Sequence, residues 1–301
     1  MPLLSQKNLP LPPLCDSSSR LLPDAQQRLD EKLLPRLGPE LASNFWGLVR
    51  KLDAMLKDVF FANAQRPEAN EARHRLLESM QAIMHDLSAL TEYLGDVLAT
   101  AIPSAGKKNK AANRDKDKLE AIVNRTFKVP INLVKHARFR LQWLECFTDS
   151  EMTTGFILGG IVEPYHHGPA SHRYPGVAEG YSFAFILRQV LPSYFRLCEI
   201  AEEALVEAKL FGPIDEAKPV GSLSLDLALL QTVVDRLAAL PVRGFPNEAN
   251  TRVPQLVLKD HALAVGTQFR LLGFKAGCRF SYEATAVNGQ AFRIPYWLTA
   301  T

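Results

Sequence analysis

Hydrophobic residues recur at every third or fourth position over most of the chain between residues 24 and 241. This spacing is typical of amphipathic α-helices, because it places the apolar side chains on one face. In residues 38–65 the repeat consists of Leu41, Phe45, Leu48, Leu52, Leu56 and Val59, and in residues 66–103 of Leu76, Met80, Ile83, Leu87, Leu90, Leu94, Val97 and Ala101. Residues 181–211 and 222–240 predict two further helices, the second opened by serine caps.

Three stretches have a different pattern. Residues 152–162 are rich in β-branched residues and interrupted by glycine, which favours a strand. Residues 252–260 and 261–274 also predict strands, and residues 278–300 alternate on both sides of Asn288–Gly289, a favoured hairpin turn. We therefore predict a mainly α fold: a multi-helix bundle with a short strand insertion and a small C-terminal antiparallel β element.

The same patterns suggest how the chain is divided. Residues 1–23 form a Pro/Leu-rich arm, expected to be flexible, although its leucines could instead dock on a neighbour. Residues 24–241 form a helical domain that contains a basic loop (104–118) and a histidine-rich loop (163–178). Residues 242–250 are a plausible boundary, and residues 250–301 form the β element.

Composition narrows the class of protein. The chain of 301 residues is 47% hydrophobic and 22% charged, as in globular proteins, and it has no apolar run of the roughly 18 residues that cross a bilayer. The N-terminus does not have the pattern of a secretory signal. The four cysteines lie far apart without a CxxC pair, which favours a reducing cytoplasm and argues against zinc held by cysteine.

The segment from Pro130 to Phe147 predicts a helix with an unusual polar stripe. Asn132, His136 and Arg140 follow one another at intervals of four, on the flank that carries the aromatic residues. As a site, Arg140 would bind phosphate, His136 would act as acid or base, and Asn132 would orient the reacting group. Alternatively, the stripe is satisfied inside the fold or across a dimer interface.

The Asn132-x3-His136 spacing resembles part of the motif of the higher-eukaryote-and-prokaryote nucleotide-binding (HEPN) superfamily. The resemblance implies an α-helical, dimerising domain related to metal-independent ribonucleases of host-defence and toxin systems. The family places an arginine four to six residues before the histidine, directly followed by a polar residue. In this chain Ile131 stands before Asn132. The resemblance therefore implies a member without hydrolytic activity, unless Arg138 or Arg140 substitutes.

Two neighbouring segments carry further candidate chemistry. Between Lys107 and Arg140 there are eleven Lys and Arg residues against three acidic ones, a concentration of charge that suits a phosphate backbone. The candidate nucleic-acid contacts are Lys107, Lys108, Lys110, Arg114, Lys135 and Arg138. A solvated linker is the alternative for the basic loop. We expect no metal, but His166, His167 and His172 are weak candidate ligands.

Two functions remain open at this stage. The first is a HEPN-like protein that associates with RNA or another nucleic acid, in a prokaryotic defence or toxin module. The second is a non-catalytic scaffold that assembles with itself or with a partner protein. Whether the chain is an enzyme stays undecided, since no standard catalytic motif is present. We expect no cofactor and a homo-oligomer, with a dimer favoured.

Overall fold

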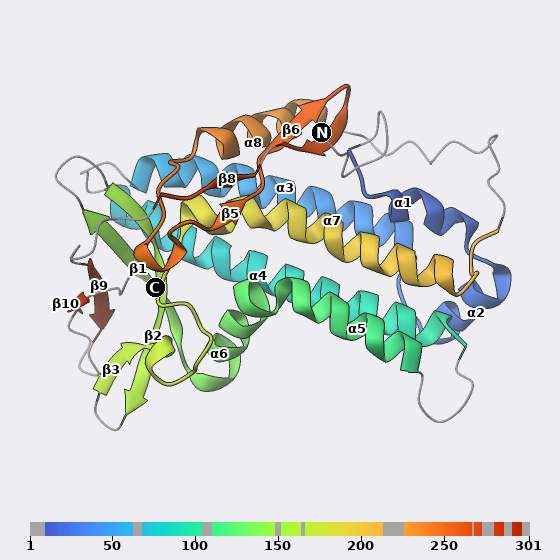
Figure 1. The fold of residues 1–301 in the computed structure, drawn as a ribbon, viewed down its shortest axis with the longest axis horizontal. Helices are drawn as coiled ribbons and strands as arrows, with labels where there is room; N and C mark the ends of the chain where they lie inside the picture. The colour runs from blue at the N-terminus through green and yellow to red at the C-terminus, as the bar shows by residue number, and fades with distance from the viewer. Residues whose placement is uncertain are drawn as a thin grey trace.

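A computed structural model describes residues 10–62, 68–103, 110–147, 152–163, 166–212, 226–266, 268–272, 280–285 and 291–296. The fold is mainly helical with a smaller amount of antiparallel β-structure, as predicted (Figure 1). The α-helices are α1 (Pro13–Ser17), α2 (Pro23–Glu31), α3 (Leu37–Ala62), α4 (Glu68–Ala101), α5 (Lys110–Val123), α6 (Val129–Ala137), α7 (Phe183–Glu207) and α8 (Leu227–Ala239).

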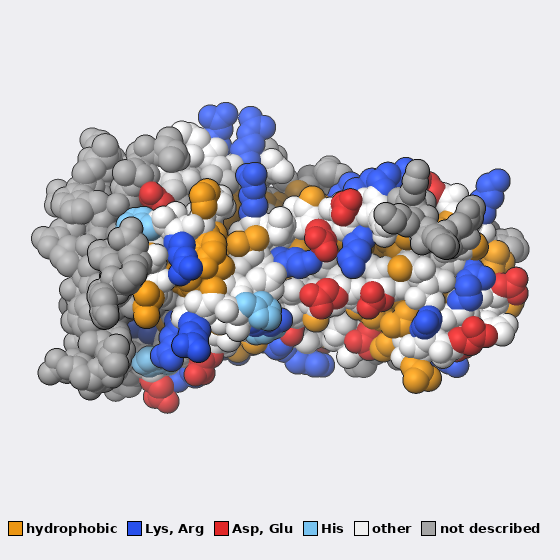
Figure 2. All heavy atoms as spheres, turned by 90° about the horizontal axis from the view of Figure 1, so that it is seen from below, with side chains coloured by type: hydrophobic (Ala, Val, Ile, Leu, Met, Phe, Trp, Pro, Cys, Tyr) orange, Lys and Arg blue, Asp and Glu red, His pale blue; other side chains and the backbone are white. Residues whose placement is uncertain are grey.

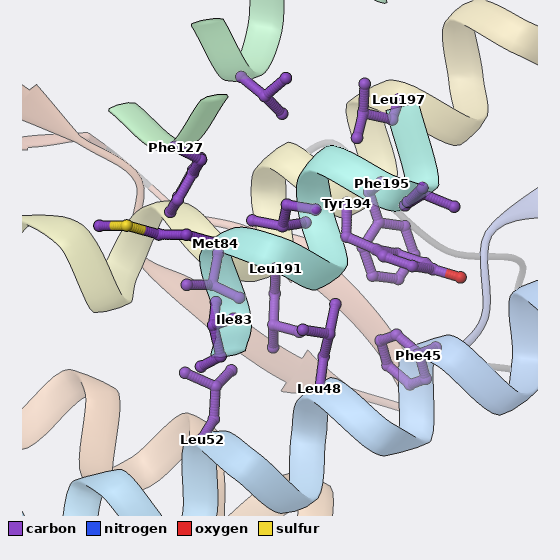
Figure 3. Close-up of a cluster of buried hydrophobic side chains, with 14 of the residues drawn as sticks. Phe45, Leu48, Leu52, Ile83, Met84, Phe127, Leu191, Tyr194, Phe195 and Leu197 are labelled. Atoms are coloured by element: carbon purple, nitrogen blue, oxygen red, sulfur yellow. The ribbon is translucent and has the colours of Figure 1, made fainter. Parts of the chain in front are cut away.

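The long helices α3, α4, α5 and α7 run side by side along the long axis of the molecule (Figure 1). Their predicted apolar faces meet in one core, where every repeat position named above in residues 38–103 is at most 3% exposed. Figure 3 shows α3, α4 and α7 each contributing side chains to this core, with Phe127 added from the π-helical turn η2 (Asn124–Lys128). The periodicity therefore identified the buried faces correctly.

The main sheet lies at one end of the bundle. It contains β1 (Arg140–Phe147), β2 (Met152–Glu163), β3 (His166–Pro169), β9 (Phe280–Thr285) and β10 (Ala291–Tyr296) in the order β10-β9-β1-β2-β3, and β4 (Tyr181–Ser182) also pairs with β2. All these pairs are antiparallel. The strand expected over residues 152–162 is confirmed, and the C-terminal hairpin extends the same sheet through β1. The Asn288–Gly289 turn lies outside the described residues.

The helix predicted from Pro130 to Phe147 is wrong in its second half. Helix α6 ends at Ala137, and β1 begins at Arg140 and pairs with β2 on one side and β9 on the other. Within β1 the side chains of Leu141, Trp143 and Glu145 are buried, and Glu145 forms an ion pair with Arg73 of α4. Hydrophobic residues alternate with polar ones at Phe139, Leu141 and Trp143, as in a strand. The apolar residues of the segment also fit the spacing of a helix, so the sequence pattern did not distinguish the two.

Residues 10–23, the described part of the predicted flexible arm, are packed against the helices. Leu11 and Leu14 are fully buried, and α1 packs against α3 and α7. Leu11 and Leu14 therefore dock on the helices of their own chain.

The segment around residues 242–250 is also packed rather than extended as a linker. Phe245 is fully buried, and the buried carboxylate of Glu248 accepts hydrogen bonds from the backbone N–H groups of Ser182 (2.8 Å) and Phe245 (2.9 Å). The bond from Ser182 connects the segment to β4 and to the start of α7.

Two small strand pairs follow this segment. Strands β5 (Arg252–Val253) and β8 (Phe269–Arg270) pair with each other, as do β6 (Leu256–Lys259) and β7 (Ala262–Val265). The helix before them, α8, is capped by Asp226, whose carboxylate accepts from the N–H of Leu229 (2.9 Å), and not by a serine. None of the described helices combines the length and the apolar character needed to cross a bilayer.

Candidate nucleic-acid interface

The junction between α6 and β1 brings the candidate residues to the surface. Arg138 ends the helix in the left-handed backbone conformation (φ 60°), and the N–H groups of Arg138 and Phe139 both donate to the carbonyl of Leu133. Phe139 is buried against the backbone of Gly160, where a Cβ would overlap its ring. Since Phe139 is held inside, its neighbours Arg138 and Arg140 project outwards on either side.

Exposed basic side chains are concentrated at this junction. We call Lys135, His136, Arg138, Arg140 and Arg173 the junction cluster; all five are exposed. None of them forms an ion pair with a carboxylate whose side chain the structure describes. The charge of the cluster is therefore available to a polyanion, since no local carboxylate of the described part neutralises it.

An aromatic contact connects the two segments that supply the cluster. The rings of Phe139 and Tyr174 meet edge to face with centroids 5.6 Å apart, and the guanidinium of Arg173 lies 5.5 Å from the centroid of Tyr174. Arg173 therefore joins a surface whose other members come from α6 and β1. The sequence analysis missed Arg173 and Tyr174, although an arginine next to an aromatic residue in the histidine-rich loop was a usable signal.

Figure 2 shows the face of the molecule that includes α6 and the adjoining end of the sheet. Along the helical part of this face, cationic and acidic side chains alternate, as expected for a solvated surface. Towards the sheet, Lys, Arg and His side chains surround exposed hydrophobic atoms (Figure 2). Ile161 of β2, which is 62% exposed, is one apolar residue at this end of the sheet.

The predicted polar stripe is not a single line on one helix. Asn132 and His136 lie one turn apart on α6, with Asn132 half-buried and His136 exposed, whereas Arg140 stands on β1 beyond the left-handed turn. His136 and Arg140 therefore need no buried partner. Ile131, at the position where the HEPN motif has arginine, is fully buried in the core.

The basic segment before α6 divides into two parts. Helix α5 begins at Lys110, so residues 110–118 are helical where a basic loop was predicted over 104–118. Arg114 forms ion pairs with Asp115 (3.1 Å) and Glu207 (2.9 Å). Arg114 is thus partly neutralised within its own chain. Lys107 and Lys108 lie outside the described residues, as does the side chain of Lys110.

The histidine-rich segment is more regular than the expected loop. Residues His166–Pro169 form β3 at the edge of the sheet, where they pair with β2. His172 ends the short 3-10 helix η3 (Ala170–His172). Among the described residues no group of three or more His, Cys, Asp and Glu side chains is placed to hold a metal ion. The side chains of His166 and His167 lie outside that description.

One neighbouring group responds to the positive charge of the cluster. The pKa of His85, on α4, is lowered first by partial burial and then by the ammonium group of Lys135, with a smaller opposing effect from Asp86. The ammonium group of Lys135 thus disfavours a further positive charge at His85.

No family model, curated protein or solved structure matches this chain. The chemistry of the junction cluster is therefore the basis for the functional argument.

Proposed function

We propose that this protein binds RNA through the junction cluster and holds the RNA without cleaving it. The observation that carries the proposal is the set of five exposed basic side chains from α6, from the α6–β1 junction with the start of β1, and from the residue after η3, none paired with a described carboxylate. A phosphate backbone supplies the regularly spaced negative charges that such a surface attracts. Arginine can also contact a phosphate through two N–H groups at once.

The absence of cleavage follows from the residue at position 131. The HEPN-type reaction would need an arginine beside Asn132, and the buried side chain of Ile131 occupies that position. Asn132 and His136, whose spacing resembles part of the HEPN motif, are therefore proposed to contact the RNA rather than to catalyse its hydrolysis. A homodimer in which two clusters form one continuous groove is the assembly that we propose.

The test compares RNA binding by two matched glycine variants. Arg138 and Lys209 are both cations that follow a helix in the left-handed conformation (φ 60° and 56°), one in the cluster and one after α7. Arg138→Gly removes a cluster charge and Lys209→Gly removes a charge elsewhere, while glycine suits both backbones. Binding of a labelled single-stranded RNA is measured by fluorescence anisotropy over a range of salt concentrations.

We expect Arg138→Gly to weaken binding and Lys209→Gly to leave it unchanged. A triple variant, Lys135→Gln/Arg138→Gly/Arg140→Gln, is expected to bind with an affinity lower by at least about tenfold. The salt slope should fall by about 0.7 for each phosphate that the variant no longer neutralises. Equal binding by the wild type and the triple variant would overturn the proposal.

The alternative function, a non-catalytic scaffold, gives a different result in the same experiment. Light scattering on the same variants reports the oligomeric state. A variant that dissociates the oligomer without changing RNA affinity would favour the scaffold. RNA cleavage that disappears in His136→Ala would show that the proposal of binding without cleavage is wrong.

A further inference from the structure

Two arginines lie directly opposite each other in the small β5–β8 strand pair. Arg252 is the register partner of Arg270, and Val253 is that of Phe269. Residues that are directly opposite in an antiparallel pair have Cα atoms about 4.5–5.5 Å apart and project on the same side. The two guanidinium groups therefore start from neighbouring positions on one face.

The inner side of this strand pair is fixed to the body of the protein. Val253 is fully buried and packs with Ala184 and Leu271, while Phe269 is half-buried against the same cluster and β5 contacts α7 (Figure 1). Backbone hydrogen bonds from the N–H of Leu271 to the carbonyl of Thr251 (2.9 Å) and from the N–H of Asn250 to the carbonyl of Leu271 (3.0 Å) hold the end of the pair that carries the two arginines. Because successive residues of a strand face opposite sides, both arginines must point to solvent, and both are exposed.

The local charge is not balanced by the described residues. Neither Arg252 nor Arg270 forms an ion pair with a carboxylate whose side chain the structure describes. Beneath them, the buried guanidinium of Arg188 lies 4.8 Å from the centroid of the Phe269 ring and donates to the backbone carbonyls of Ala184, Leu240 and Pro241. Like charges directly opposite on two strands destabilise the pair.

We propose that Arg252 and Arg270 form a binding site for a phosphate group, separate from the junction cluster. A tetrahedral oxyanion between two guanidinium groups can accept paired N–H donors from each, and its charge removes their mutual repulsion. The same chemistry is offered by free phosphate, by a phosphomonoester and by a phosphodiester. The rigid strand pair keeps the two arginines together before the anion arrives.

The test measures thermal stability in phosphate against chloride at equal ionic strength. We expect phosphate to raise the melting temperature of the wild-type protein specifically, because it binds the folded state. Arg252→Gln and Arg270→Gln should each lower the affinity for phosphate by about tenfold. Each should also melt at a higher temperature than wild type in chloride, since one of the two repelling charges is gone.

Two control variants make the result specific. Lys259→Gln removes an exposed cation from β6, and Lys209→Gly removes one after α7, outside the junction cluster; both should keep the full response to phosphate. The rise in melting temperature is then compared for inorganic phosphate, glycerol 2-phosphate and dimethyl phosphate. The compound with the largest rise shows whether the site prefers free phosphate, a phosphomonoester or a phosphodiester. No phosphate response in the wild type, or the same response in the Arg252→Gln/Arg270→Gln double variant, would overturn the proposal. Neither result would affect RNA binding by the junction cluster.

Discussion

The guanidinium group of Arg73 on α4 lies 2.6 Å from Oε1 of Glu145 on β1 and connects the sheet to the helical bundle. The same oxygen accepts a hydrogen bond from the indole N–H of Trp143 (2.6 Å), and the Arg73 guanidinium stacks 5.3 Å from the centroid of that ring. Both charged side chains are largely buried, Glu145 more than Arg73. The position of β1, and with it Arg140, therefore depends on this ion pair.

Replacing Glu145 with Gln should destabilise the protein by about 2–3 kcal/mol, because the partly buried Arg73 cation is left without its counter-charge. The free energy of unfolding in urea measures the effect. Arg75→Gln is the control, since Arg75 pairs with Asp58 at the surface, where an ion pair contributes little. If both variants were destabilised equally, the Arg73–Glu145 pair would not have the role assigned to it.

Gly155 and Gly47 should respond in opposite ways to substitution by alanine. A Cβ on Gly155 of β2 would overlap the carbonyl oxygen of Tyr181 and lie 2.7 Å from the Cα of Ser182, so β4 could not stay paired. We expect Gly155→Ala to cost at least about 2 kcal/mol.

Gly47 lies inside α3, and a Cβ there meets nothing within 4 Å. Gly47→Ala should therefore stabilise the protein by up to about 1 kcal/mol, since alanine is the better helix former. The melting temperatures of Gly155→Ala and Gly47→Ala, compared with that of the wild type, test both predictions. A stable, unchanged Gly155→Ala protein would contradict the close approach of β4 to β2.

Stability should depend on pH through Glu248. Burial raises the pKa of this carboxyl to about 7 in the folded protein, against the opposing hydrogen bonds from Ser182 and Phe245. The folded state then binds more protons than the unfolded state, whose carboxyl titrates near its ordinary value of 4.5. The contribution of the protonated Glu248 carboxyl to the free energy of unfolding is fully present below pH 4.5. It is lost as the pH rises towards about 7.

We expect the free energy of unfolding to fall by about 2–3 kcal/mol through this group between about pH 5 and about pH 8. Urea titrations at a series of pH values measure it. Glu248→Gln, which resembles the protonated form, should remove this part of the dependence. A pH profile that is the same in wild type and Glu248→Gln would show that Glu248 does not titrate in this range.

Arg138→Gly should leave the protein at least as stable as the wild type. A non-glycine residue in the left-handed conformation costs about 1–2 kcal/mol. The gain from removing that strain is partly offset, because the cation of Arg138 also lies favourably at the C-terminus of α6. Calorimetry of Arg138→Gly and Lys209→Gly, the latter after α7, tests this. A large decrease in stability in Arg138→Gly alone would mean that the arginine side chain holds the junction together.

The sequence by itself determined the helical faces. The repeat of Leu41, Phe45, Leu48 and Leu52 depends only on the geometry of one helix, so the buried side of α3 followed from the spacing alone. The same reasoning identified β2 and the C-terminal hairpin strands. It also placed Asn132 and His136 one turn apart, which α6 preserves.

Only the tertiary structure decided where α6 ends and what surrounds the junction. Residues 138–147 fit both a helical and an alternating pattern. Residues 140–147 form a strand because the backbone groups of β2 and β9 pair with β1. The contact of Tyr174 with Phe139 and the pairing of Arg252 with Arg270 likewise join segments far apart in the chain. Local spacing carries no information about such contacts, because their partners are selected by the packing of the whole chain.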